Sequence, residues 1–163
     1  MNARPAAAAD AGAICAIYNA GIAERVATFE KEPRTPEQVV AWLGGVHPTV
    51  VVEDEAAVVA FAAASSYRPR ACYAGVAEFS VYVAPAARGQ GAGRLAMETL
   101  IETAEEAGFW KLVSGVFVEN EASRRLLRSL DFREVGVYEK HGRLDGRWRD
   151  VVIVEKLLAS AGD

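Results

Sequence analysis

A glycine-rich segment, Arg88-Gly89-Gln90-Gly91-Ala92-Gly93, has the residue types that point most directly to chemistry. Glycines allow a tight turn whose backbone N–H groups face one concavity, and a helix that starts there adds the positive end of its dipole. Such a turn binds phosphate, with Arg88 and Arg94 available for ionic contacts at its rim. A P-loop is excluded because Gly-Lys-Ser/Thr is absent, and the spacing does not match the dinucleotide-binding GxGxxG pattern. A plain turn before a surface helix would also use glycine, so both interpretations stay open.

Glu78 and His141 are the side chains best suited to moving protons. Glu78 falls in the strand-like segment 74–83, where desolvation would raise the pKa of a carboxylate and let it accept a proton from an ammonium group. A solvent-facing strand glutamate is the simpler interpretation, and residue type alone favours it. His141 has an imidazole that accepts protons near neutral pH, but a lone histidine near a strand end is more often structural or exposed.

Two arginines, Arg68 and Arg70, flank Pro69 in a segment with loop character. Guanidinium groups make paired, charge-assisted hydrogen bonds to oxyanions, so the two together could hold a small acidic ligand. A solvated basic loop is the alternative. Cys72 follows closely and could be a covalent nucleophile, but no histidine adjoins it in sequence. A small apolar filler is therefore the better interpretation of Cys72.

The elements that must position these side chains alternate along the chain. Apolar periodicity and capping residues predict helices over 11–20, 36–43 and 91–107, and a fourth that begins at Asn120. Strand character marks the segments 3–5, 49–53, 56–65, 74–83, 110–118, 132–140 and 148–157. Because several strands follow one another as hairpins, we expect an α/β (α+β) fold with a mixed, mostly antiparallel sheet.

Composition narrows the class of protein. The 163 residues fit one domain, 1–163, and the formal net charge of −4 argues against a general nucleic-acid binder. Cys15 and Cys72 show no metal-ligand spacing, so we expect no disulfide framework and no metal, and a reducing cytoplasm fits best. The apolar stretch from Ala56 to Ala64 is far shorter than the roughly 20 residues of a membrane helix. No secretory signal is visible, and we expect a cytoplasmic protein without a membrane partner.

The glycine-rich segment supplies the pattern Arg-x-x-Gly-x-Gly after a strand that ends Val-Tyr-Val-x-Pro. This combination resembles the acetyl-CoA pyrophosphate loop of the GNAT superfamily of N-acetyltransferases, and the match covers nearly the whole chain. The resemblance implies a twisted sheet split by a β-bulge, helices on both faces, and acetyl-CoA as co-substrate. The residues that it implies for binding acetyl-CoA are Val81, Val83, Arg88, Gly89, Gln90, Gly91, Gly93, Arg94, Asn120 and Ser123.

Further stretches resemble the phosphinothricin acetyltransferase branch, and especially its arsinothricin-resistance relatives. They are Ile17-Tyr18-Asn19, Ala27-Thr28-Phe29-Glu30-Lys31-Glu32-Pro33, Tyr67-Arg68-Pro69-Arg70-Ala71-Cys72-Tyr73, the strand 77–83 and Lys140-His141-Gly142. These enzymes acetylate the α-amine of glutamate analogues that carry a methylphosphinate or methylarsinate head. Compared with the phosphinothricin enzymes, this chain has inserted residues before Trp148, which leaves the placement of His141 relative to Trp148 open.

The same resemblance implies roles for individual residues. Glu78 would be the general base and His141 a second base or an orienting group. Arg68 and Arg70 would bind the acidic groups of the substrate, while Phe29, Glu30 and Tyr73 would line its pocket. Independently of the resemblance, Tyr82 or Tyr138 could protonate the departing thiolate, but neither is favoured, because a thiol with a pKa of about 8.5 needs little help to leave as the thiolate. A homodimer is also implied.

Alternatives remain at this stage. Another amine could be the acceptor, such as methionine sulfoximine, a protein N-terminus or a polyamine, although the arginine pair would repel a polyamine. A non-catalytic acyl-CoA-binding module would bind coenzyme A without acetyl transfer. The sequence does not separate arsenic from phosphorus, because both heads are tetrahedral, anionic and similar in size.

Overall fold

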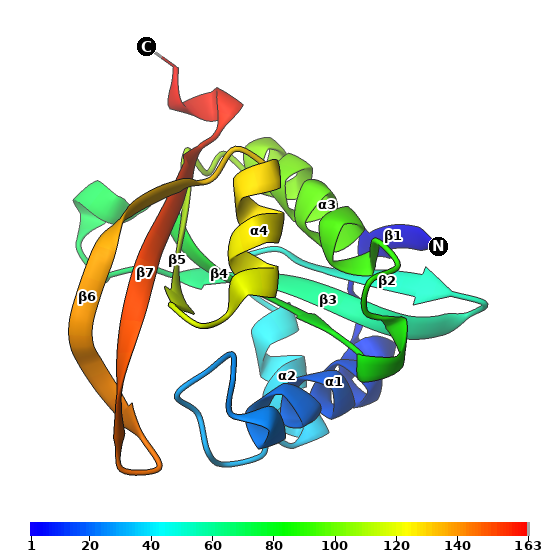
Figure 1. Ribbon diagram of the computed structural model, residues 1–163. Coiled ribbons are helices and arrows are strands. Elements are labelled where there is room, and N and C mark those ends of the chain that lie inside the picture. The colour runs from blue at the N-terminus through cyan, green and yellow to red at the C-terminus, as the bar shows by residue number, and fades with distance from the viewer. Residues whose placement is uncertain (163) are drawn as a thin grey trace.

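The computed structural model describes residues 1–162 as a seven-stranded sheet with helices packed on both faces (Figure 1). The strand order is β1-β2-β3-β4-β5-β7-β6, and every neighbouring pair is antiparallel except β4 with β5. The predicted mixed, mostly antiparallel sheet is therefore confirmed. The strands are β1 (Asn2–Pro5), β2 (Thr49–Asp54), β3 (Ala57–Ser66), β4 (Val76–Val83), β5 (Lys111–Phe117), β6 (Arg133–Leu144) and β7 (Arg147–Leu157).

The four α-helices divide between the two faces of the sheet. Helices α1 (Ala11–Glu24) and α2 (Pro36–Leu43) cover one face, and α3 (Ala92–Glu106) and α4 (Glu121–Ser129) cover the other (Figure 1). Alternate residues of a strand point to opposite faces of the sheet, so β2 contributes to the cores on both faces. Val51 and Phe61 are buried with α1 and α2, whereas Val50 and Val52 are buried in the larger core beneath α3. No helix among residues 1–162 combines the length and the apolarity needed to span a membrane.

Local signals account for the helix ends. The Thr35 side chain accepts a hydrogen bond from the Gln38 backbone N–H, and Pro36 occupies the first turn of α2, as predicted. Helix α1 runs four residues beyond the predicted end at 20 and stops at Arg25, which adopts a left-handed φ of 61°. Asp10 precedes α1 but does not cap it with its side chain; its carboxylate binds Arg4 instead, at 2.8 and 2.9 Å.

The sheet opens between β4 and β5. These parallel strands pair at Val76↔Lys111, Ala77↔Leu112 and Glu78↔Val113, and among the described residues the pairing stops there. Both strands continue, β4 to Val83 and β5 to Phe117. Strand β4 meanwhile pairs with β3 in a regular register. The split was expected from a β-bulge, but it arises where β4 and β5 diverge.

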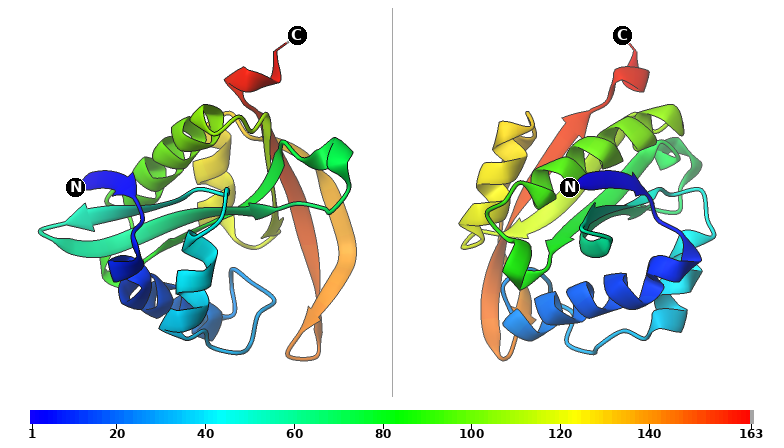
Figure 2. Two further views of the ribbon diagram at one scale, coloured as in Figure 1. Left: turned by 180° about the vertical axis from the view of Figure 1, so that it is seen from behind. Right: turned by 90° about the vertical axis from the view of Figure 1, so that its right-hand side faces the viewer.

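Strands β6 and β7 form a hairpin longer than the predicted segments 132–140 and 148–157. Its tip is Asp145-Gly146, with φ values of 50° and 77°, as a two-residue type I′ turn requires. The inserted residues before Trp148 therefore lengthen the hairpin. Figures 1 and 2 show this tip beside the segment that joins α1 to α2.

Candidate functional site

A cavity of about 560 Å³ lies at the opening between β4 and β5. It is walled by the two diverging strands, by α4, by the β6–β7 hairpin and by the segment between α1 and α2. The lining residues for which the sequence analysis named a role are Phe29, Glu30, Glu78, Val81, Tyr82, Asn120, Ser123 and His141. The cavity thus brings together side chains that are far apart in the sequence.

Glu78 lies on β4 at the last position that pairs with β5, and it lines the cavity. The carboxylate meets solvent there, but the surrounding protein desolvates it and raises its pKa, and the positive charge of Arg68 partly offsets this rise. A carboxylate with a raised pKa in a cavity is suited to proton transfer. Glu78 is exposed, as the simpler interpretation expects, but the surface that it faces is the wall of a cavity.

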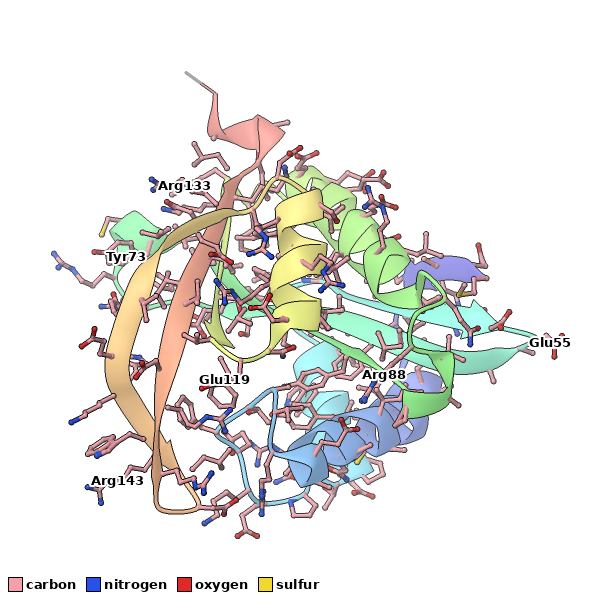
Figure 3. The ribbon with its side chains drawn as sticks, viewed as in Figure 1. Glu55, Tyr73, Arg88, Glu119, Arg133 and Arg143 are labelled. Atoms are coloured by element: carbon pink, nitrogen blue, oxygen red, sulfur yellow. The ribbon has the colours of Figure 1, made fainter. Side chains whose placement is uncertain are left out.

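The arginine loop lies at one end of β4. The Arg68 guanidinium sits 4.9 Å from the centroid of the Tyr67 ring, and Tyr73 packs edge-on against the same ring at 5.5 Å. The charge of Arg68 acts on Glu78, but Arg68, like Arg70 and Tyr73, does not line the cavity. In Figure 3 Tyr73 lies far from Arg88, which follows the other end of β4.

Phe29 closes one side of the cavity because Gly142 makes room for it. A Cβ atom at Gly142 would stand 2.7 and 2.8 Å from two atoms of the Phe29 ring. The ring also packs edge-on against Phe117 of β5, with centroids 4.8 Å apart. The segment between α1 and α2 is thereby seated against β5 and the β6–β7 hairpin.

Arg149 of β7 holds the same segment through polar contacts. Its guanidinium donates hydrogen bonds to the Arg25 carbonyl at 3.2 Å and to the Glu119 carboxylate at 3.4 Å, and it stacks 4.1 Å from the centroid of the Phe117 ring. Arg25 in turn pairs with Asp145 at the hairpin tip, at 3.1 Å. Figure 3 shows Glu119 at the junction of these elements.

His141 reaches the cavity from an interruption in the β6–β7 pairing. The register jumps from Tyr138↔Val151 to Gly142↔Arg149, so residues 139–141 stand opposite Asp150. His141 lines the cavity and packs against Tyr138 at 4.7 Å between ring centroids. Trp148 pairs with Arg143, two residues beyond His141 on the far side of the interruption.

Tyr82 lines the cavity from β4, but its ring is embedded between other aromatic rings. It stacks on Phe61 at 5.5 Å and meets Tyr18 edge-on at 5.0 Å between ring centroids. Gly21 permits this packing, because a Cβ there would lie 2.7 Å from the Tyr82 ring. Burial raises the pKa of Tyr82, which makes its hydroxyl a weaker acid than that of an exposed tyrosine.

The glycine-rich turn lies beyond the end of β4 and leads into α3. Gly89 and Gly91 have φ values of 75° and 88°, a conformation that favours glycine, and α3 begins at Ala92. The helix N-terminus and the turn therefore have the backbone expected of an anion site. Gly93 connects this turn to the opening, because a Cβ there would lie 3.2 Å from the Val83 side chain.

Both arginines of the turn have carboxylate partners. Arg88 binds Glu24 of α1 through two hydrogen bonds of 2.9 and 2.7 Å, and Arg94 binds Glu98 at 2.9 Å. Neither Arg88 nor Arg94 lines the cavity, and the same holds for the other predicted cofactor residues Val83, Gly89, Gln90, Gly91 and Gly93. On the opposite wall, the Asn120 side chain accepts a hydrogen bond from the Ser123 backbone N–H and caps α4.

Comparison with known proteins shows the family to which the chain belongs. A family model described as the Acetyltransferase (GNAT) family matches residues 17–132. The chain belongs to the GNAT acetyltransferase family. It is 35% identical over 162 residues to the phosphinothricin N-acetyltransferase of Streptomyces coelicolor, with 95% of each chain covered. The predicted fold and superfamily are confirmed.

Two solved GNAT structures superpose on nearly the whole chain. The phosphinothricin acetyltransferase from Sinorhizobium meliloti, in complex with AcCoA, matches with a TM-score of 0.92 and 31% identity, covering 99% of this chain and 91% of that one. The ribosomal-protein-alanine N-acetyltransferase from Brucella melitensis matches with a TM-score of 0.92 and 35% identity, covering 97% of this chain and 100% of that one.

Sequence reasoning missed part of the cavity wall of this GNAT protein. Ser65, Ser114 and Gly115 line the cavity, and so does Val151 on β7. Ser65 faces Glu78 across the β3–β4 pair, a relation that follows from strand register. The pattern of the sequence carries no signal for register, so these residues could be found only after the strands were aligned.

Proposed function

We propose that this GNAT protein transfers the acetyl group of acetyl-CoA to the α-amine of a glutamate analogue such as phosphinothricin or arsinothricin, and that acetylation confers resistance to it. The observation that carries the proposal is the Glu78 carboxylate, whose pKa is raised in a cavity at the sheet opening and which senses the charge of Arg68. The relative from Streptomyces coelicolor named for phosphinothricin supports the substrate class. We place the reaction in the cytoplasm.

The residues at the opening fit acetyl-CoA. Beyond Glu78, the diverging β4 segment carries Val81 and Val83, whose backbone groups can pair with an amide-rich ligand as an added strand would. The turn 88–93 and the start of α3 would hold a diphosphate, with Asn120 and Ser123 on the opposite wall. When bound, acetyl-CoA supplies a thioester from which the acetyl group is transferred.

The remaining residues act on the acceptor. Glu78 removes a proton from the ammonium group, so that the neutral amine can attack. Arg68 and Arg70 hold the two acidic groups of the substrate and orient the amine. Phe29 and Glu30 form the neighbouring wall, and Tyr73 is the third residue that we assign to the acceptor. His141 is a second base or an orienting group.

Other amines are the competing acceptors. Methionine sulfoximine has an amino-acid backbone and a compact tetrahedral head, and the Brucella melitensis relative is named for the alanine of a ribosomal protein. We expect kcat/KM for phosphinothricin and arsinothricin to exceed that for methionine sulfoximine and for an alanine-initiated peptide about tenfold or more, because only the first two carry a fully anionic head for the arginines. A peptide preferred over all three amino-acid analogues would contradict the proposed substrate class.

We also propose a homodimer that uses the sheet edge. Strand β6 is outermost in the sheet, and its side chains Val135, Val137 and Tyr138 are 49%, 53% and 52% exposed. Apolar side chains that are exposed together on an edge strand are normally covered. Val137→Lys should shift sedimentation toward the monomer, whereas Val46→Lys, at a site that is 79% exposed elsewhere, should not. Identical sedimentation of both variants and the parent would contradict this interface.

A further inference from the structure

Ser114 of β5 stands at the point where the β4–β5 pairing ends. Its hydroxyl donates a 2.9 Å hydrogen bond to the backbone carbonyl of Phe79, the residue after the last paired position of β4. Ser114 is likewise the residue after the last paired position of β5, and both residues line the cavity. The next carbonyl group of the β4–β5 ladder, that of Phe79, thus accepts a hydrogen bond from a side chain and not from the backbone.

The direction of the backbone shows which bond the serine replaces. The Lys111 N–H donates to the Gly75 carbonyl at 3.3 Å, so alternate residues of β5 turn their N–H groups toward β4. In a parallel ladder the pattern repeats every two residues, and the N–H of Gly115 would meet the carbonyl of Phe79. The Ser114 hydroxyl donates to that carbonyl in place of the Gly115 N–H, and Gly115 lines the cavity.

We infer that Ser114 is a positioning residue that stops the β4–β5 ladder and keeps the opening wide enough for the pantetheine arm. This inference rests on the proposed binding of acetyl-CoA in the opening. Without the hydroxyl, the Phe79 carbonyl pairs with the Gly115 N–H, because a partly buried carbonyl without a partner is costly. The ladder then lengthens by one step and the opening narrows next to Glu78. Ser114 takes no part in the chemistry itself.

The test compares Ser114→Ala with Ser114→Thr, which keeps a hydroxyl. A matched control is Ser160→Ala, since the Ser160 hydroxyl also donates to a phenylalanine carbonyl, that of Phe109, outside the cavity. Two quantities are measured on each folded variant: the exchange rate of the Gly115 amide in the free protein by NMR, and the Kd for coenzyme A by calorimetry. Neither measurement requires acetyl transfer, so a failure of the inference is distinct from a failure to find an amine substrate.

We expect Ser114→Ala to slow exchange of the Gly115 amide and to raise the Kd for coenzyme A about fivefold or more. Ser114→Thr and Ser160→Ala should stay within about twofold of the parent protein on both measures. The inference is overturned if the Gly115 amide is not slowed in Ser114→Ala, if its Kd changes less than about twofold, or if the threonine variant behaves like the alanine variant. Absence of coenzyme A binding by the parent protein would instead refute the proposed function.

Discussion

The Asp150 carboxylate of β7 accepts a 2.8 Å hydrogen bond from the backbone N–H of Lys140 on β6, at the interruption of the β6–β7 ladder. Lys140 has a positive φ of 47°, which an ordinary residue adopts at a cost. The carboxylate thus satisfies an N–H that the ladder leaves free, and it fixes the conformation from which the next residue, His141, reaches the cavity.

We therefore expect Asp150→Ala to lower kcat/KM about tenfold through the displacement of His141. Asp150→Asn should lose less, since an amide oxygen can still accept the Lys140 N–H. A double-mutant cycle decides the mechanism: in a His141→Ala background, Asp150→Ala should cost less than about twofold. An equal loss in both backgrounds would show that Asp150 acts by another route.

The raised pKa of Glu78 predicts the pH below which kcat/KM falls. Glu78 must be ionised to accept a proton, so kcat/KM should fall as the pH drops through its pKa, above the value of about 4.3 for a free glutamate. Arg68→Ala removes the charge that partly lowers this pKa, so the acid limb should move to higher pH.

Arg70→Ala is the matched control for this pH profile, because it removes the same charge from the same loop. Arg70→Ala should lower the maximal kcat/KM because the substrate binds more weakly. The pH at which kcat/KM falls on the acid side should stay the same as in the parent protein. A limb that stays fixed in Arg68→Ala, or that moves equally in both variants, would disprove the electrostatic link between Arg68 and Glu78.

The contact between Gly142 and Phe29 predicts an overpacking effect. Gly142→Ala places a methyl group within 2.8 Å of the Phe29 ring and should lower the free energy of unfolding by about 1–3 kcal/mol, together with kcat/KM. Gly136→Ala on the same strand meets open space and should change stability by less than about 0.5 kcal/mol. In a Phe29→Ala background, Gly142→Ala should be nearly neutral in chemical denaturation; a persistent cost there would mean that the backbone at 142, and not the ring, requires glycine.

The contacts of Arg149 predict that its replacement affects KM for the amine acceptor but not KM for acetyl-CoA. Its contacts with the Arg25 carbonyl and Glu119 seat the segment that carries Phe29 and Glu30. Arg149→Met should therefore raise KM for the amine acceptor several-fold and leave KM for acetyl-CoA within about twofold. Arg147→Met, at an exposed position two residues earlier, is the control. Equal increases in both KM values would show a general loss of structure instead.

Much of the fold followed from local signals in the sequence. Thr35-Pro36 and Gly91 gave the starts of α2 and α3, and apolar alternation gave the strands. The predicted segment 132–140 is shorter than β6, although the dipeptide Asp145-Gly146 is typical of type I′ hairpins and marks the turn at which β6 ends.

The site was less accessible from the sequence because it depends on register and on interruptions of register. Chemistry and resemblance together point to Glu78 and His141, and resemblance alone points to Phe29. Their convergence depends on where β4 leaves β5 and on the residues opposite Asp150. The hydrogen bond from Ser114 to the Phe79 carbonyl joins residues 35 positions apart on two different strands. Nothing in either segment alone indicates this contact.

Acetyl transfer by the purified protein and by its Glu78→Gln variant decides whether Glu78 serves an acetyltransferase. Both proteins are assayed with acetyl-CoA and phosphinothricin, and the reaction is followed as release of free thiol and as the mass of the amino-acid product. We expect N-acetylphosphinothricin from the parent protein, and a kcat reduced about 10²–10³-fold in Glu78→Gln with an unchanged Kd for coenzyme A. Equal turnover by the two proteins, or binding of coenzyme A by the parent without acetylation of any amino-acid analogue, would contradict the account.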